Sequence, residues 1–319
     1  MTVNRRHLLT GLMAASAAQS QPRPAQSKSW HARLGVYCRY SPANLEFLSK
    51  EGFTVVQLAI SPTLSPDLKP AQLDQVKENI RKSGLTVVAL LQSGNHLDPN
   101  PTARARFQDR FARALELAAE LKVSLIATSS GAIPGDPFEK QVANVVSTYE
   151  QKYFPICEKH RLKIIWEPHV NPFNIATGPV GFSALLKAFH DSPYVGIQLD
   201  PSHLAWQMID PVECIREFAG KIHNVHLKDT EILQPVLRRA GIQPLDGSRW
   251  WRFRLPGSGL IDWKGFFSAL ADTGYSGGMN IENEDQFTYP AYDGENFTES
   301  FKAGYRTAHA FIRQLVPNV

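Results

Sequence analysis

From residue 34 onward, short apolar runs rich in Val, Ile and Leu alternate with longer segments in which apolar residues recur every three or four positions. The short runs are typical of strands buried on both faces, and the longer segments are typical of amphipathic helices. The expected strands cover residues 34–38, 55–60, 86–91, 124–128, 163–167, 195–200, 222–227 and 278–282. The expected helices cover residues 42–50, 70–83, 102–121, 137–160, 179–190, 211–219, 263–272 and 297–315.

Regular alternation of strands and helices predicts an α/β fold with a parallel sheet, and the count of eight favours closure into a single-domain (β/α)8 TIM barrel. An open, doubly wound sheet is the alternative. It is disfavoured because the dinucleotide-binding pattern Gly-x-Gly-x-x-Gly does not follow the first strand, where Arg39-Tyr40-Ser41-Pro42 stands instead.

One connection is unusually long, because residues 229–260 separate the seventh strand from the next helix. In a barrel, a loop that follows a strand lies at the C-terminal end, where active sites are built. The segment Trp250-Trp251-Arg252-Phe253-Arg254 combines aromatic rings with guanidinium groups, which suit the C–H face and the oxygens of a sugar. We therefore expect Trp251 and Arg252 to contact a substrate. The alternative is a loop that packs its tryptophans over the barrel rim or a neighbouring subunit.

The composition adds limits on the kind of partner. With 43% apolar and 20% charged residues over 319 positions, the chain is an ordinary globular protein. The formal net charge is only +4, and no basic stripe suggests a nucleic-acid partner. Cys38, Cys157 and Cys214 are far apart in the sequence and are expected to be buried thiols. The sequence leaves open whether the chain forms a homo-oligomer.

The first residues have the pattern of an export signal. Arg5-Arg6 precedes an apolar stretch at 8–15, and small residues follow at 15–18. This order resembles a twin-arginine signal, so we expect a signal and linker at 1–28, a barrel domain at 29–319 and a periplasmic or otherwise exported protein. The apolar stretch is too short to span a membrane. The alternative is the disordered start of a cytoplasmic protein.

Four expected strands end on a residue that can bind a metal ion, namely Glu167, Asp200, His226 and Glu282. Each has an ordinary explanation by itself, since an aspartate before Pro201 can cap a helix and a lone histidine is often a core residue. In a closed barrel, however, these strand ends are neighbours, and three adjacent buried carboxylates repel one another unless a cation neutralises them. We therefore expect one divalent cation. The three-oxygen, one-nitrogen donor set favours Mn²⁺, with Mg²⁺, Co²⁺ and Zn²⁺ as alternatives.

The segments around these residues resemble a known family. Glu-Pro-His at 167–169, Asp-Pro-Ser-His at 200–203, His-Leu-Lys-Asp at 226–229 and Ile-Glu-Asn-Glu at 281–284 are similar to segments of the sugar isomerase and epimerase superfamily of xylose isomerase-like TIM barrels. The resemblance covers roughly residues 33–315, and the spacing of the first three segments is similar to that of ketose 3-epimerases. The connection 229–260 is longer than expected for that branch, so the substrate stays open.

The resemblance implies proton transfer next to a carbonyl group. The cation would bind the carbonyl oxygen and a neighbouring hydroxyl oxygen and stabilise the enediolate formed on deprotonation. Glu167 and Glu282 would each bind the cation through one oxygen, one removing a proton and the other returning one from the opposite face. Further expected substrate contacts are His203, His169, Lys228 and His96. His169 and Lys228 could instead support the metal ligands, and His96 could be an ordinary loop residue.

Several outcomes of this chemistry stay open. Reprotonation elsewhere gives an isomerase, reprotonation on the other face gives an epimerase, and loss of a leaving group gives a lyase that eliminates the aglycone from a 3-keto-glycoside. In each case the partner is a small-molecule sugar, keto-sugar or glycoside. Two remote alternatives are a DNA-repair endonuclease on the same barrel, which requires a cluster of several zinc ligands, and a sugar-binding protein without turnover.

Overall fold

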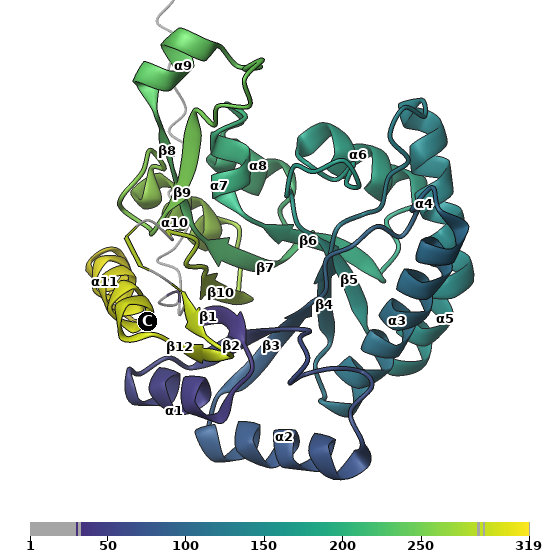
Figure 1. Ribbon diagram of the computed structural model, residues 1–319, viewed down its shortest axis with the longest axis horizontal. Helices are drawn as coiled ribbons and strands as arrows, with labels where there is room; N and C mark the ends of the chain where they lie inside the picture. The colour runs from purple at the N-terminus through teal and green to yellow at the C-terminus, as the bar shows by residue number, and fades with distance from the viewer. Residues whose placement is uncertain (1–29, 31–32, 286–287, 290, 319) are drawn as a thin grey trace, which may run out of the picture. The chain divides into compact units, whose positions relative to one another are not determined.

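The computed structural model describes residues 30, 33–285, 288–289 and 291–318, and the barrel lies within the unit His31–Val319. The expected signal and linker at 1–28 lie outside the described residues. Eight parallel strands form a closed barrel in the order β1-β10-β7-β6-β5-β4-β3-β2 (Figure 1). These strands are β1 (Arg33–Arg39), β2 (Val55–Ala59), β3 (Thr86–Leu91), β4 (Leu125–Thr128), β5 (Lys163–Trp166), β6 (Val195–Leu199), β7 (Ile222–Leu227) and β10 (Gly278–Ile281). The predicted (β/α)8 barrel is confirmed.

Helices follow the strands and lie around the outside of the barrel (Figure 1). They are α1 (Pro42–Lys50), α2 (Pro70–Ser83), α3 (Pro101–Glu120), α4 (Phe138–Lys152), α5 (Phe154–His160), α6 (Pro179–Ala188), α7 (Pro201–Ala205), α8 (Pro211–Glu217), α10 (Trp263–Asp272) and α11 (Glu299–Leu315). The single helix expected at 137–160 is wrong, because α4 and α5 are separated at Tyr153. Pro155 explains the break, since it lacks an N–H and its ring clashes with the carbonyl four residues earlier. None of the helices among the described residues combines the length and apolar character that a membrane span requires.

Packing between β1 and β2 leaves no room for a side chain at Gly35. A Cβ atom at this position would lie 2.3 Å from the carbonyl oxygen of Val55 in the neighbouring strand, so only glycine fits here without a backbone shift. Apolar side chains make up most of the buried core, which also contains the buried polar side chains Gln57, Gln198, Asn224 and Asn280. The three thiols expected to be buried are buried, and these are Cys38, Cys157 and Cys214.

The long connection after β7 is a β-hairpin rather than an irregular loop. Strand β8 (Asp229–Ile232) pairs antiparallel with β9 (Trp251–Arg254), and helix α9 (Gln234–Ala240) lies between them in the chain. Figure 1 shows this hairpin and α9 extending away from the barrel. The sequence pattern did not predict β8 and β9, because residues 233–250 separate them, whereas the commonest hairpin turns join two strands through two residues. A further small pair, β11 (Tyr292–Asp293) and β12 (Asn296–Phe297), precedes α11.

Candidate metal centre

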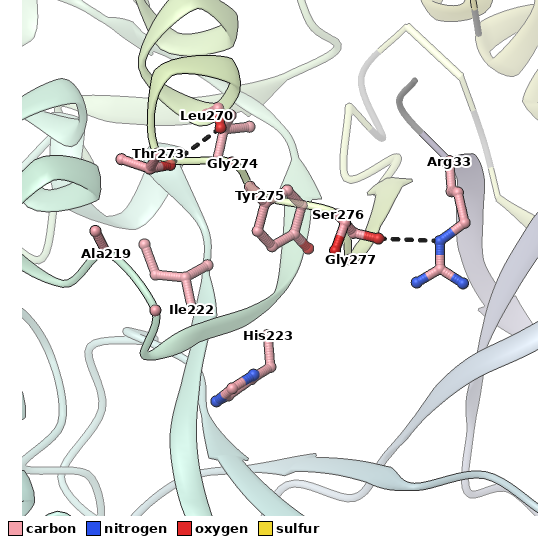
Figure 2. Close-up of a pocket in the computed structure, with 11 residues that line it drawn as sticks. Arg33, Ala219, Ile222, His223, Leu270, Thr273, Gly274, Tyr275, Ser276 and Gly277 are labelled. Atoms are coloured by element: carbon pink, nitrogen blue, oxygen red, sulfur yellow. Dashed lines mark hydrogen bonds between the residues drawn. The ribbon is translucent and has the colours of Figure 1, made fainter. Parts of the chain in front are cut away.

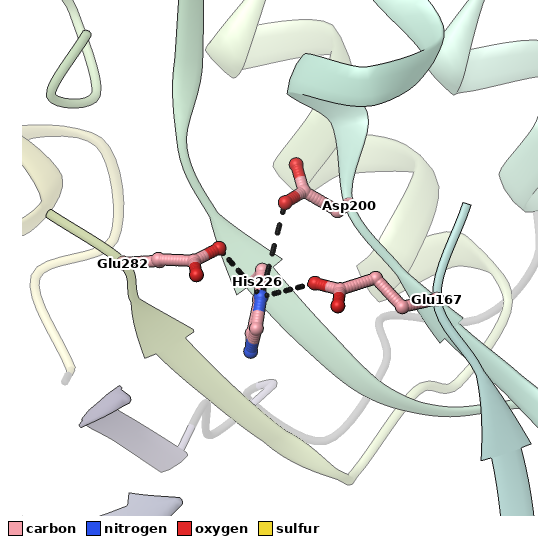
Figure 3. Close-up of side chains that lie close together, drawn as sticks. All are labelled: Glu167, Asp200, His226 and Glu282. Carbon is pink, nitrogen blue, oxygen red and sulfur yellow. Dashed lines mark ion pairs between the residues drawn. The ribbon is translucent and has the colours of Figure 1, made fainter. Parts of the chain in front are cut away.

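The four predicted ligands meet at the C-terminal end of the barrel. Glu167 and Asp200 follow β5 and β6 directly, His226 lies near the end of β7, and Glu282 follows β10. One ligand atom from each residue lies within 4.8 Å of the others, and all four residues are buried. Figure 3 shows Glu167 and Glu282 approaching His226 from opposite sides, with Asp200 approaching from a third direction. Within the described part of the chain, this is the one group of at least three His, Cys, Asp or Glu residues that could hold a metal ion.

His226 Nδ1 is the common contact of the three carboxylates. It lies 2.9 Å from Glu167 Oε1, 2.9 Å from Glu282 Oε2 and 3.8 Å from Asp200 Oδ2. In the described structure, Glu167 Oε1, Asp200 Oδ2 and His226 Nδ1 are buried and form ion-pair contacts but no hydrogen bond. Buried polar atoms of this kind require a partner. The convergence of three carboxylates and one imidazole therefore fits a divalent cation.

Asp200 has two separate tasks, one for each carboxylate oxygen. Oδ1 accepts hydrogen bonds from the backbone N–H of Ser202 at 2.9 Å and from its hydroxyl at 2.7 Å, which caps helix α7. Oδ2 faces the other three predicted ligands; Glu167, Asp200, His226 and Glu282 together form the ligand cluster. The helix cap and the metal ligand were alternative explanations from the sequence, and the geometry accommodates both. The cap fixes the side chain, so that Oδ2 is presented to the cluster without freedom to rotate.

A row of buried side-chain amides next to the cluster determines how His226 is oriented. Its Nε2 lies 2.8 Å from Gln57 Oε1, an atom that can only accept, so Nε2 carries the proton and donates. Gln57 Oε1 also accepts from Asn224 Nδ2 at 2.7 Å, and Gln198 Oε1 accepts from both Gln57 Nε2 and Asn224 Nδ2 at 2.8 Å. Asn280 Nδ2 extends the row to Asn224 Oδ1. Nδ1 of a neutral His226 is thereby left with its lone pair directed at the cluster.

Lys228 lies on the other side of the cluster. Its Nζ is 2.7 Å from Glu282 Oε2, 2.7 Å from Glu284 Oε2 and 3.1 Å from Asp200 Oδ2. The side chain is 1% exposed, whereas that of Glu284 is 40% exposed. Lys228 was expected either to contact a substrate or to support the metal ligands. The contacts that the structure shows are with two of the ligands, Asp200 and Glu282, and with Glu284.

The charges of the cluster shift the pKa values of its members in opposite directions. Burial lowers the pKa of His226, but the charges of Glu282 and Glu167 outweigh burial, and the net pKa lies well above its ordinary value. The same balance between burial and the charges of Asp200, Glu282 and Glu284 raises the pKa of Lys228. Burial raises the pKa of Asp200, yet the charge of Lys228 and other cluster contacts bring it well below its ordinary value. A proton on His226 thus occupies the position that the lone pair would offer to a cation.

The hairpin brings an aromatic surface to the edge of the site. The Phe253 ring lies 4.2 Å from Lys228 Nζ and 4.9 Å from the ring of His203. Trp251 stacks on Trp206 with ring centroids 4.5 Å apart and planes 9° apart, and the Arg249 guanidinium lies 3.7 Å from the Trp251 ring centroid. Trp251 therefore packs on Trp206 at the barrel rim, and its contact with a substrate stays a prediction.

The remaining candidates fall into two groups. His203 borders the cluster, with Nε2 3.6 Å from Asp200 Oδ2, and its ring lies 4.8 Å from that of the exposed His169. Arg252 pairs instead with Glu231 at 2.8 Å. Burial and the charge of Lys228 hold the pKa of His203 well below its ordinary value, so it is neutral.

His96 is not part of the site. It is fully buried, and its ring nitrogens contact the Tyr153 hydroxyl at 2.8 Å and the Thr128 hydroxyl at 3.0 Å. Aromatic rings, including those of Phe107 and Phe111, surround it. Burial lowers the pKa of His96 to about 3, so this histidine is neutral. It is a hydrogen-bonded core residue, which was neither of the expected alternatives.

Two cavities lie at opposite ends of the barrel, and only one of them borders the ligand cluster. One, of about 220 Å³, is lined by Glu282 and Glu284 together with Tyr37 and Tyr292, and it offers space for a ligand beside the candidate metal centre. Another, of about 280 Å³, lies at the opposite, N-terminal end of the barrel (Figure 2). Tyr275, which lines it, donates its hydroxyl to the carbonyl of Gly278. Catalytic groups of this fold lie at the C-terminal end, so we assign the site to the first cavity.

Several residues around the cluster were missed from the sequence, although a signal existed. The amides Gln198, Asn224 and Asn280 each precede a ligand by two positions, while Glu284 follows one by two. Side chains two apart on a strand point to the same side of the sheet. A polar residue inside an apolar strand, two positions from an expected ligand, could therefore have been predicted to face the barrel interior. Gln57 and Phe253 have no such neighbour and required the three-dimensional structure.

A family model and one relative resemble this chain over most of its length, and a second relative resembles it over about half. A family model described as xylose isomerase-like TIM barrel matches residues 45–315. The uncharacterized protein YfiH of Bacillus subtilis strain 168 is 29% identical over 310 residues, covering 85% of this chain and 94% of that protein. An inosose dehydratase of Clostridium botulinum strain Alaska E43 is 28% identical over 149 residues, covering 46% of this chain and 49% of that enzyme. The chain thus spans about half the length of this second relative.

Solved structures support the fold at low sequence identity. The D-psicose 3-epimerase from Clostridium cellulolyticum H10, solved with D-tagatose, has a TM-score of 0.67 and 18% identity, covering 89% of this chain and 99% of that one. The 3-keto-D-glucoside 4-epimerase YcjR from E. coli has a TM-score of 0.66 and 15% identity, with the same coverage. The resemblance predicted from the four strand-end segments is confirmed. Because the family model covers most of the sequence, this chain belongs to the xylose isomerase-like TIM barrel family.

Proposed function

We propose that the protein is a divalent-metal-dependent sugar isomerase or epimerase that transfers a proton at the carbon next to a carbonyl group. The observation that carries the proposal is the arrangement of Glu167 and Glu282 on opposite sides of His226, with one oxygen of each directed at the candidate metal position (Figure 3). A cation bound there would supply polarisation of the substrate carbonyl. The donor set favours Mn²⁺ over a softer ion.

The residues of the chain divide the remaining work. Glu167 directs Oε1 and Glu282 directs Oε2 at His226, which leaves Glu167 Oε2 and Glu282 Oε1 to carry protons. One carboxylate removes the proton from one face of the substrate, and the other returns a proton from the opposite face. His203, neutral and at the edge of the cluster, is suited to a hydrogen bond with a substrate hydroxyl. This division accounts for epimerisation, and transfer to the neighbouring carbon accounts for isomerisation.

A second candidate is a lyase that removes a leaving group after the same deprotonation. The similarity to inosose dehydratase over about half of that enzyme favours it, because dehydration begins with the same kind of step. For a 3-keto-glycoside, the leaving group would be the aglycone. The two candidates share Glu167 and Glu282 and differ in the fate of the deprotonated substrate.

Proton exchange in D₂O tests the proposal directly. The Mn²⁺-loaded protein is incubated with a panel of ketoses and with a 3-ketoglucoside, and ¹H NMR records deuterium incorporation and products. We expect incorporation next to the carbonyl for at least one member of the panel. A new stereoisomer or positional isomer supports the first candidate, and a free aglycone or an unsaturated product supports the second.

Matched variants separate catalysis from binding. Glu282→Gln and Glu167→Gln should each reduce exchange by about a hundredfold or more, as expected for loss of a general base. Glu213→Gln is the control, because this carboxylate forms an exposed ion pair with Arg216 far from the cluster. Exchange at the wild-type rate in Glu282→Gln, or no exchange with any substrate in Mn²⁺, Mg²⁺, Co²⁺ or Zn²⁺, would refute the proposal and favour a sugar-binding protein.

A further inference from the structure

Lys228 is the one lysine among the described residues that contacts the ligand cluster. Carboxylates, an imidazole and an aromatic ring enclose its ammonium group. Three carboxylates, from Asp200, Glu282 and Glu284, lie within 3.1 Å of Nζ. His203 Nε2 lies 3.4 Å away. The Phe253 ring covers the same ammonium group at 4.2 Å. A side chain that is 1% exposed and held in this way cannot move its charge into water without moving the hairpin.

Four carboxylates gather around Lys228, and its charge offsets part of theirs. Glu167, Asp200 and Glu282 are buried together, and Glu284 adds a fourth carboxylate at the edge. Adjacent carboxylates in a poorly solvated site repel one another and lose hydration. Lys228 supplies a permanent positive charge against three of the four. The protein therefore contains a neutralising group for the ligand set that does not depend on a bound ion.

Lys228 also contacts the same atoms that would bind the ion. Glu282 Oε2 faces both Lys228 Nζ and His226 Nδ1, and so does Asp200 Oδ2. A divalent cation held by those two oxygens would lie close to the ammonium group, and like charges at short range repel. The lysine that stabilises the ligand set without a cation thus opposes the cation when it binds.

We propose that Lys228 is a built-in counter-cation, which holds the ligand carboxylates together in the ion-free protein and weakens the affinity of the site for its divalent cation. The inference rests on the proposed function only in assuming that the cluster binds a divalent cation. It assigns Lys228 as a positioning residue and explains why the hairpin residue Phe253 covers it. A site arranged in this way is ready to bind an ion without rearrangement, and it releases the ion more readily than four ligands alone would.

The test measures Mn²⁺ affinity and thermal stability together, on the full chain. Isothermal titration gives the Kd for Mn²⁺, and thermal unfolding gives Tm with and without Mn²⁺, for the wild type, Lys228→Met and Lys228→Gln. We expect both variants to bind Mn²⁺ at least about tenfold more tightly, equivalent to about 1.4 kcal/mol. Their Tm should fall more without Mn²⁺ than with it, because the ion replaces the missing charge. Lys221→Met is the control, since Lys221 pairs with the exposed Asp191 at 2.9 Å.

A double variant distinguishes charge from packing. Adding Glu284→Gln to Lys228→Met removes one uncompensated carboxylate, so the Tm of the ion-free protein should recover part of its loss. A role in packing alone predicts no recovery. If a lysine variant folds only when Mn²⁺ is present, the inference is supported. If both variants fail to fold in either condition, or bind Mn²⁺ with the wild-type Kd or more weakly, the inference is overturned.

Failure of the proposed function would be visible separately. The wild type should bind Mn²⁺, and Asp200→Asn should reduce that binding by at least about tenfold, because it removes one charged ligand. Absence of divalent-ion binding by the wild type would refute the metal site itself. Wild-type binding together with an unchanged Kd in Lys228→Met would refute only the role of Lys228.

Discussion

Replacement of Asp229 by Asn tests how the β8–β9 hairpin is attached to the barrel. The buried carboxylate of Asp229 accepts four hydrogen bonds. Oδ1 accepts from the backbone N–H groups of Thr230 at 2.8 Å and Ile261 at 3.2 Å, and Oδ2 accepts from the N–H of Gly257 at 3.1 Å and the indole of Trp263 at 2.8 Å. Asparagine has one oxygen and one NH₂ group, so in either orientation two of these donors face another donor.

The expected loss in the free energy of unfolding follows from the two hydrogen bonds that Asp229→Asn removes. A buried donor without an acceptor costs about 1–3 kcal/mol, so two of them would lower the free energy of unfolding by about 2–6 kcal/mol. Part of this loss is offset. Burial raises the pKa of Asp229 in spite of its hydrogen bonds, which means that the native protein destabilises the charged form, and neutral asparagine avoids that cost. We therefore expect the lower part of the range, about 2–4 kcal/mol.

Urea unfolding measures the global loss, and hydrogen exchange read by mass spectrometry locates it. Peptides from 229–263 should lose protection to a greater extent than the barrel strands do, because the four bonds join the two ends of the hairpin segment. Asp246→Asn is the control. This exposed residue accepts from Ser248 near the hairpin tip, and its replacement should cost less than about 0.5 kcal/mol. A wild-type urea midpoint for Asp229→Asn, or equal loss of protection across the barrel, would refute the reasoning.

Three further predictions concern the barrel and the rim. His96→Gln should make the free energy of unfolding less sensitive to acid. Burial lowers the pKa of His96 from 6.5 to about 3, so between these pH values only the unfolded chain binds the proton, and the native protein loses stability as pH falls from about 6.5 toward 3. Urea midpoints across that range should show a smaller loss in the variant. Gly35→Ala should lower the free energy of unfolding by about 1–3 kcal/mol, because its Cβ would overlap the Val55 carbonyl, and urea unfolding tests this value. A double-mutant cycle on Trp206 and Trp251 should give a coupling of about 0.5–1.5 kcal/mol, and a value near zero would contradict the observed stacking.

The barrel could be predicted because its determinants are local. The expected strands at 86–91 and 222–227 coincide with β3 and β7, and each of the other six differs by one residue at one or both ends. Each apolar run carries its own strand signal, and alternation with helices then restricts the topology to very few arrangements. The four ligands were predicted for the same reason, since parallel strands in a closed barrel place their C-terminal ends together.

The surroundings of the ligands could not be predicted in this way, because they depend on contacts between distant segments. Lys228 and Glu284 are 2.7 Å apart in space but belong to different strand ends. Strand β9 alternates aromatic and charged residues, but its partner β8 has no such alternation, and α9 lies between the two strands in the chain. His96 shows the opposite error. A polar residue in a loop after a strand was predicted to face the pocket, yet hydroxyl partners allow it to be buried in an aromatic core.

Lys228 and Asp229 are consecutive, and together they couple the hairpin to the ligand cluster. The Asp229 carboxylate ties the ends of the hairpin segment together, and Phe253, carried by that hairpin, covers the Lys228 ammonium group. If Asp229→Asn loosens the hairpin, water reaches Lys228 and screens its charge, so the repulsion between lysine and cation should weaken. We therefore expect the Mn²⁺ Kd of Asp229→Asn to shift from the wild-type value toward that of Lys228→Met, as titration would show. An unchanged Kd in a variant whose hairpin has lost protection would show that the hairpin and the metal affinity are independent.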